Sequence, residues 1–277
     1  MKLSEKPIIY LDQNVIIDLE KSYLKQFEQI LLQSRENGEI LIPFSSTHIY
    51  ETNNITGKNR KKFIQDRLSY ISRFTGNLYL NHSQDVREFR LKIVKPEIVY
   101  RGITEPPTVQ PIMHDLLNVL PHKYFSAFRD ALTISVNELN NFSPPNVIEQ
   151  IESYLNKKYI QYYPDGQGFK LRPYFKMCLG FNPGYQNFGL FQKMPGFFSL
   201  LNTFGYNPDK KSPKSIIAGF YDSDHAANAA CADYFVTNDK KLEIKSLVAY
   251  EFFEVETKVL NVENMTDIIK NGWLVKS

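Results

Sequence analysis

Short apolar runs alternate with amphipathic stretches at the start of the chain. Pro7–Leu11 is a compact run of β-forming residues, and its continuity is typical of a strand buried on both faces of a parallel sheet. Ser22–Arg35 carries apolar residues at helical spacing, and Ile40–Phe44 forms a second short apolar run. The order strand, helix, strand over about forty residues predicts a βαβ unit.

Helix signals follow the second apolar run. Ser45, Ser46 and Thr47 offer N-caps for a helix over His48–Asn53. A longer helix is expected over Lys58–Phe74. The second strand should therefore lead directly into helical structure.

The C-terminal part repeats this alternation of helices and strands. We expect a helix at Asp224–Ala232, a strand at Tyr234–Thr237, a short helix at Lys240–Lys245, a strand at Glu254–Leu260 and a helix at Asn264–Lys270. Alternation at both ends of a chain is typical of an α/β fold with a largely parallel sheet. We therefore predict a three-layer α/β/α core around a central, mostly parallel sheet.

The middle of the chain lacks this alternation. Helices are expected at Met113–Leu120, Tyr124–Leu139 and Pro144–Leu155, and the stretch Tyr159–Tyr206 is rich in aromatic residues and glycine. We interpret the middle as an insertion that is helical at first and then irregular. The predicted organisation is a core of residues 1–77, an insertion of residues 78–213, and a second part of the core at residues 214–277.

Composition limits the functional classes. Lys and Arg total 33 against 30 Asp and Glu, and the net charge of +3 excludes a histone-like protein but allows a local basic groove. The two cysteines, Cys178 and Cys231, are too few for a disulfide framework or a cysteine-based zinc site. No apolar run approaches the roughly 20 residues that span a bilayer, and the start of the chain lacks a signal-peptide pattern. We expect a cytoplasmic protein without membrane contact.

Acidic residues follow or flank several of the predicted strands. They are Asp12 after the first strand, Glu51 in the helix after the second, Asp222 and Asp224 ahead of the alanine-rich helix, and Asp239 after Tyr234–Thr237. In a parallel sheet these positions meet at the carboxyl edge, where ligands bind. Crowded carboxylates repel, and a hard cation such as Mg²⁺ or Mn²⁺ resolves the conflict. Alternatively, Asp224 could N-cap its own helix and Asp239 could cap Lys240–Lys245.

The residues around these acids resemble the PIN-domain family, a ribonuclease fold of many prokaryotic toxins and of eukaryotic RNA-processing factors. The matching stretches are Ile9–Val15, Ser46–Glu51, and Asp224–Ala230 running into Val236–Asp239. The resemblance covers about Pro7–Phe74 and Ser215–Lys270. Compact toxin-type members lack an insertion of the kind predicted here.

The resemblance implies a site and an activity. The family's metal-binding and catalytic acids would be Asp12, Glu51, Asp224 and Asp239, holding Mg²⁺ or Mn²⁺. The gap between the last two acids is shorter than in many toxin-type members, which leaves Asp222 and Asp233 as substitutes. The family's polar residue two positions after the first acid matches Asn14, and its Ser or Thr before the last acid matches Thr237. The implied activity is endonucleolytic hydrolysis of single-stranded or structured RNA.

Other residues are candidates for substrate contact. Asn238 neighbours the matched acids, and Lys58, Arg60 and Lys61 follow Glu51 closely enough to hold a nucleic-acid backbone. The alternative for these basic residues is a solvated helix face. His225 and His48, next to the predicted acids, fit either a contact with phosphate or ordinary packing. In the insertion, aromatic side chains such as those of Tyr162, Tyr163 and Tyr174 could stack on bases or be buried.

Several functions share these features. A structure-specific DNA nuclease of the flap-nuclease type uses the same acidic cluster, and a PIN-like scaffold could bind RNA or a partner without cutting it. A homo-oligomer or a regulatory protein partner is compatible with either. Phosphotransfer of the haloacid-dehalogenase type needs an Asp where Asn14 stands, and a glycine-rich phosphate loop is absent from the sequence. We therefore predict a metal-dependent ribonuclease first.

Overall fold

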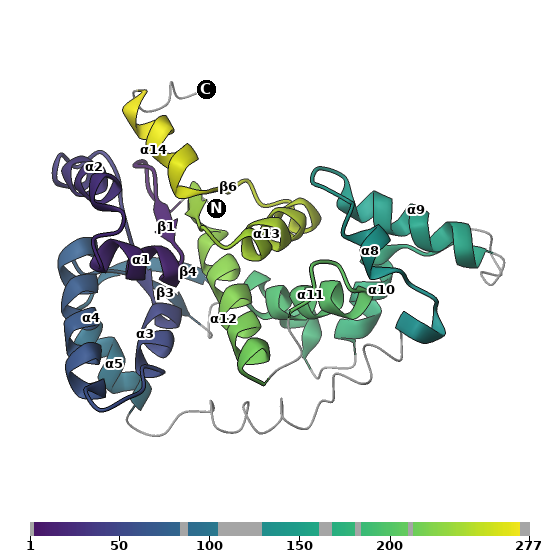
Figure 1. Ribbon diagram of the computed structural model, residues 1–277, viewed down its shortest axis with the longest axis horizontal. Coiled ribbons are helices and arrows are strands. Elements are labelled where there is room, and N and C mark those ends of the chain that lie inside the picture. The colour runs from purple at the N-terminus through teal and green to yellow at the C-terminus, as the bar shows by residue number, and fades with distance from the viewer. Residues whose placement is uncertain are drawn as a thin grey trace. The chain divides into compact units, whose positions relative to one another are not determined.

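The computed structural model describes residues 3–83, 88–104, 129–160, 168–180, 184–209 and 213–271 (Figure 1). The chain divides into two compact units. Unit 1 comprises Met1–Ile112, His225–Glu243 and Glu256–Ser277, and unit 2 comprises Met113–Asp224 and Ile244–Val255. The insertion was expected to begin at residue 78, whereas unit 1 continues to residue 112.

Unit 1 contains a three-stranded parallel sheet in the order β1-β5-β6. Its strands are β1 (Ile9–Leu11), β5 (Tyr234–Val236) and β6 (Lys258–Leu260). Every residue of β1 and β5 is buried, as expected for strands covered on both faces. The parallel sheet and its strands are therefore confirmed, although the last strand is shorter than the predicted Glu254–Leu260.

A second sheet of unit 1 has the order β2-β3-β4, with β2 parallel to β3 and β4 antiparallel to it. Its strands are β2 (Phe44–Ser45), β3 (Leu78–Ser83) and β4 (Glu88–Ile93). The predicted strand Ile40–Phe44 is wrong in extent, because Leu41 forms only a single parallel bridge with Ile8. Pro43 has no N–H to donate to a ladder and separates this bridge from β2.

The strands β3 and β4 are absent from the sequence prediction, which assigned residues 78–93 to the insertion. Along β4 the side chains are exposed or half-buried throughout. Its sequence nonetheless alternates charged and apolar residues from Glu88 to Ile93, and the apolar Phe89 and Leu91 are half-buried. This alternation indicates a strand that the prediction missed, and the six positions paired with β3 identify it in the folded chain.

Helices of unit 1 surround these strands (Figure 1). They are α1 (Gln13–Glu20), α2 (Lys25–Glu36), α3 (Ser46–Asn53), α4 (Arg60–Thr75), α5 (Pro96–Thr104) and α14 (Val262–Lys270). Helices α3, α4 and α5 pack against one another, and α14 packs against α2. The expected helices of this part are confirmed, whereas α1 and α5 were not expected.

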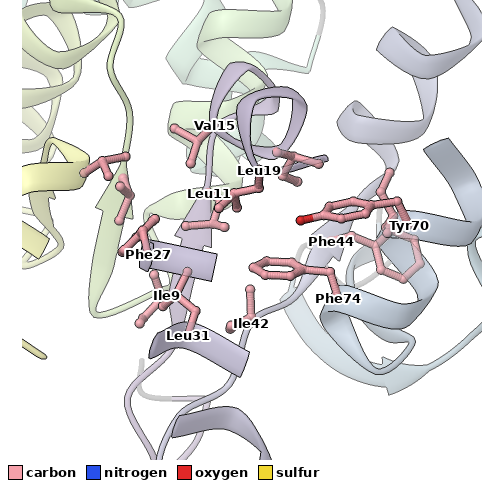
Figure 2. Packing of buried hydrophobic residues seen from close by; sticks show 14 of the residues in the cluster. Ile9, Leu11, Val15, Leu19, Phe27, Leu31, Ile42, Phe44, Tyr70 and Phe74 are labelled. Carbon is pink, nitrogen blue, oxygen red and sulfur yellow. The ribbon is translucent and has the colours of Figure 1, made fainter. Parts of the chain in front are cut away.

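The core of unit 1 forms where β1 and its neighbouring helices meet (Figure 2). Leu11 and Val15 are buried beside Leu19 of α1. On α4, the rings of Tyr70 and Phe74 are stacked with centroids 5.7 Å apart. This packing holds β1, α1 and α4 as one body, so the residue that follows β1 has a defined position.

The alanine-rich helix and the helix after β5 are both longer than predicted. The first is α12 (Pro213–Ala229), and the second is α13 (Lys240–Phe253). Asp224 lies inside α12, so the alternative that it N-caps this helix is wrong. The helix instead begins at Pro213, whose missing N–H costs nothing in the first turn.

Unit 2 consists of helices and connections in its described residues. They include α8 (Val136–Leu139), α9 (Val147–Tyr159), α10 (Leu171–Leu179), the 3-10 turn η2 (Tyr185–Asn187) and α11 (Leu190–Phe204). The helix predicted at Pro144–Leu155 is shifted to α9. Of the one predicted at Tyr124–Leu139, residues 129–139 are described, and the helical structure there is interrupted at Thr133, whose φ is 47°. Met113–Leu120, Tyr162 and Tyr163 lie outside the described residues.

Several phenylalanines in the described part of unit 2 are core residues. Phe197 stacks on Phe252 with ring centroids 4.4 Å apart, and Phe175 packs edge-on against both rings. Tyr174 packs against Phe169 and is half-buried. Buried packing, the alternative to a base-stacking surface, therefore describes the phenylalanines of this cluster.

Candidate functional site

Parallel pairing brings the residues after β1 and β5 to one edge of the sheet. The Asp12 N–H donates to the Val236 carbonyl at 2.9 Å, which continues the ladder by one residue. The bridge between Ile8 and Leu41 sets β2 parallel to β1, so α3 begins at the same edge. Asp12, Glu51 and Asp239 are therefore carried by three segments that start there.

Asp12 is enclosed by the protein. It is 1% exposed, and its Oδ2 accepts hydrogen bonds from Thr237 Oγ1 at 3.1 Å and from Asn14 Nδ2 at 3.4 Å. Burial raises the pKa of this carboxyl, and the charges of Glu51 and Asp239 raise it further, whereas His225 and Thr237 lower it. The carboxylate thus lies among charges of its own sign with few donors around it.

Thr237 links Asp12 to Asp239. Its buried hydroxyl donates to Asp12 and accepts the Asp239 backbone N–H at 3.0 Å. Because both bonds have ordinary lengths, Asp12 Oδ2 lies within about 6 Å of the Asp239 nitrogen. Asp239 Oδ1 also accepts the N–H groups of Lys241 at 2.8 Å and Leu242 at 3.1 Å. The capping alternative for Asp239 is therefore confirmed, and one of its carboxylate oxygens is engaged at the start of α13.

Glu51 approaches the site from α3. Its Oε2 lies 2.6 Å from Nε2 of His225, on the last turns of α12. The His225 ring is 1% exposed, whereas the Glu51 side chain is 25% exposed. A buried ring therefore holds a carboxylate that faces solvent in part.

A buried chain of hydrogen bonds continues from His225 toward Asp12. His225 Nδ1 lies 2.8 Å from the Tyr10 hydroxyl, which lies 2.7 Å from Ser45 Oγ. The Ser45 N–H donates to His48 Nδ1 at 2.9 Å, and His48 Nε2 donates to the Leu11 carbonyl at 2.9 Å. Since Nδ1 accepts, His48 is neutral, and burial lowers its pKa well below the usual value.

Two other candidates near β5 have structural partners. Asp233 precedes β5, and its Oδ2 accepts the Ile8 N–H at 2.8 Å, at the amino edge of the sheet opposite Asp12. Asn238 is exposed, and its Oδ1 accepts the N–H of Val262 at 3.2 Å at the start of α14. Asp233 is therefore separated from the acids at the carboxyl edge.

The remaining candidates lie on helices. Asp222 and Asp224 are half-buried in the part of α12 that belongs to unit 2, whereas the other acids belong to unit 1. Lys58 and Lys61 are exposed at the start of α4. The Arg60 guanidinium donates to carbonyl oxygens of Asn53 and Ile55, where α3 ends.

Sequence reasoning missed the role of Tyr10 and left the two histidines undecided between phosphate contact and packing. The structure shows both rings packed and buried. A signal was present for Tyr10, which lies within an otherwise apolar strand expected to be buried on both faces. A buried tyrosine hydroxyl needs a hydrogen-bond partner, so polar residues had to be near it.

Unit 1 thus has a mixed α/β fold with carboxylates gathered at the carboxyl edge of a parallel sheet. No protein-family model, curated protein or solved structure matches the chain. Within the described residues, no group of three or more His, Cys, Asp or Glu side chains is arranged so that it could hold a metal ion. None of the helices in the described ranges has the length and hydropathy needed to cross a bilayer.

Proposed function

We propose that the chain is a metal-dependent endoribonuclease, with a PIN-like, three-layer α/β/α core in unit 1. The observation that carries the proposal is the buried Asp12 carboxylate, which has Glu51 and Asp239 within electrostatic reach. A folded protein gains nothing in stability from such crowding. Residues that act on a substrate or a cation are where such arrangements occur.

The chemistry of these side chains suits a hard divalent cation. All three are carboxylates, and Asp12 accepts only two hydrogen bonds from the described residues although a carboxylate can accept about four. Mg²⁺ keeps several waters and is commonly held by one or two carboxylates together with substrate phosphates. Asp12 and Asp239 would meet this requirement, with Glu51 ligating directly or through water.

When bound, Mg²⁺ or Mn²⁺ would activate a water and neutralise charge at the scissile phosphate. The chain's own part is to hold the carboxylates in place. The Thr237 hydroxyl orients Asp12 by donating to its carboxylate, and it fixes the start of α13 by accepting the backbone N–H of Asp239. The exposed Lys58 and Lys61 would attract the nucleic-acid backbone, whereas Arg60 chiefly secures the end of α3.

The test is incubation of the pure protein with labelled single-stranded RNA and single-stranded DNA, in Mg²⁺, Mn²⁺ or EDTA. Cleavage of RNA that needs the cation and is lost in Asp12→Asn is expected. Asp224→Asn belongs in the same assay, because the family resemblance makes it the fourth acid. Asp267→Asn, an exposed acid on α14, is the matched control.

Other outcomes would replace the proposal. Cleavage of DNA alone would indicate a DNA nuclease. Cation-independent binding of RNA without cleavage would indicate a scaffold. Wild-type rates in folded Asp12→Asn protein would remove Asp12 from the site.

A further inference from the structure

One unbroken chain of hydrogen bonds connects the two ends of the proposed site. It starts at Glu51, passes through His225, Tyr10 and Ser45, and reaches His48, which bonds the carbonyl of the residue before Asp12. The Ser45 and His48 side chains are 3.2 Å apart. Glu51 and the backbone next to Asp12 are thus connected by buried hydrogen bonds as well as by the pairing of the strands.

The donors and acceptors at the two ends of this chain follow from their partners. An ionised Glu51 can only accept, so His225 Nε2 donates to it. At the other end the Ser45 N–H can only donate, so His48 Nδ1 accepts and His48 Nε2 donates to the Leu11 carbonyl. Between the two ends, His225 Nδ1 bonds the Tyr10 hydroxyl, which also bonds Ser45 Oγ. Both nitrogens of the buried His225 ring therefore have partners, and Tyr10 fixes the ring at the nitrogen that does not bond Glu51.

We propose that His225 is a positioning residue for Glu51, and that Tyr10 holds the His225 ring in the orientation this requires. The inference rests on the proposed function, because it concerns the placing of a carboxylate toward the cation. Glu51 has a flexible side chain that is one-quarter exposed, and such a side chain loses rotamer freedom when held. The ring that holds it is enclosed and fixed at its other nitrogen.

A purely structural role would be served by apolar packing. Tyr10, His48 and His225 are in mutual ring contact, with centroids 4.8 to 5.8 Å apart. Their polar atoms are nonetheless bonded in series, with His225 Nε2 on Glu51 at one end and His48 Nε2 on the Leu11 carbonyl, next to Asp12, at the other. Outer partners of this kind orient ligating side chains, and removing them usually weakens metal affinity ~10–100-fold.

The test measures Mn²⁺ binding by isothermal titration calorimetry on the full chain without substrate. His225→Asn places an amide only where Nδ1 was and removes the bond to Glu51, whereas His225→Gln can place an amide nitrogen where Nε2 was. Tyr10→Phe removes the hydroxyl and keeps the ring. Tyr70→Phe is the matched control, because it also removes the hydroxyl of a buried tyrosine, one that donates to Glu28 of α2 at 2.8 Å and has no part in this chain.

We expect His225→Asn to weaken Mn²⁺ binding ~10–100-fold and Tyr10→Phe to weaken it less. His225→Gln should retain most of the Mn²⁺ affinity of the wild type. The Mn²⁺ concentration that half-saturates RNA cleavage should rise in parallel, and excess Mn²⁺ should restore the rate. Tyr70→Phe should change only the melting temperature. Should His225→Asn fail to fold, Tyr10→Phe and His225→Gln, which preserve more of the side-chain volume, still decide the question.

Two results would overturn the inference and can be told apart from failure of the proposed function. Unchanged Mn²⁺ binding in Tyr10→Phe and His225→Asn, with binding lost in Glu51→Gln, refutes positioning and leaves the metal site standing. Equal loss in His225→Gln and His225→Asn shows that the bond to Glu51 is not the cause. No Mn²⁺ binding by the wild-type chain rejects the site and the inference together.

Discussion

Replacing Asp12 with asparagine should stabilise the cation-free protein near neutral pH. The amide keeps the shape and can still accept from Thr237, while the substitution removes a buried charge beside two other carboxylates. Two unit charges about 6–8 Å apart interact by about 2–3 kcal/mol at an effective dielectric constant near 20. The attraction of His225 offsets part of the repulsion by Glu51 and Asp239, which leaves about one such interaction. A charged acceptor makes a hydrogen bond stronger by about 1 kcal/mol than a neutral one. The net gain should therefore be about 1–2 kcal/mol.

The pH dependence of this gain follows from the direction of the pKa shift. Burial raises the pKa of Asp12 in the folded state above the ordinary value of 3.8, so the native protein binds the proton more tightly than the unfolded chain. The free energy of unfolding of the wild type should fall as the pH rises from 3.8 through the raised pKa, and stay lower above it. The variant lacks this loss. Its advantage should therefore shrink as the pH is lowered toward 3.8.

Thermal melts followed by circular dichroism in EDTA, near neutral pH and near pH 4, measure the effect. A change of 1 kcal/mol shifts the melting temperature of a domain of 150–250 residues by about 2–4 °C. Asp267→Asn should shift it at neither pH. Mn²⁺ at a hundred times its dissociation constant should stabilise the wild type by about 2.7 kcal/mol and the variant far less. A variant that melts below the wild type in EDTA at neutral pH would refute the reasoning, because the carboxylate would then be stabilised without a cation.

Three other predictions concern unit 2 and the start of α4. Asp209→Ala should lower the free energy of unfolding by about 3–5 kcal/mol, because it removes the carboxylate that lies 2.7 Å from the buried ammonium group of Lys245. Urea denaturation should show a smaller loss in the double variant Asp209→Leu with Lys245→Met, which leaves no buried charge. An equal loss in the two variants would contradict this prediction. Phe197→Ala, at a buried position in the aromatic cluster, should cost about 3–5 kcal/mol and leave RNA binding, measured by fluorescence anisotropy on the folded fraction, unchanged. The double variant Lys58→Ala with Lys61→Ala should melt like the wild type. The slope of the logarithm of the binding constant for single-stranded RNA against the logarithm of the salt concentration should decrease in magnitude by about 1.4. An unchanged slope would exclude contact of these two lysines with phosphate.

The acids at the strand ends show how far local pattern can lead. Asp12 and Asp239 follow apolar runs whose continuity indicated buried parallel strands, and the structure pairs those strands in register. Parallel pairing alone brings the two residues to one edge. What pattern could not decide was the use of Asp239, which also caps α13. A capping acid and a ligating acid have the same sequence context.

The apolar runs, the helical spacings and the order of elements determined the parallel sheet, most helices of unit 1 and the edge at which the acids meet. These features depend on residues near one another in the chain, where periodicity reports burial directly. Only the tertiary structure decided the pairing of β3 with β4, the length of α12 and the chain of hydrogen bonds from Glu51 through His225 to Tyr10. The alternation of charged and apolar residues over Glu88–Ile93 indicates a strand but does not specify the strand with which it pairs. The bonds of His225 join residues 174 and 215 positions apart, and such partners are selected by packing in three dimensions, which no local spacing records.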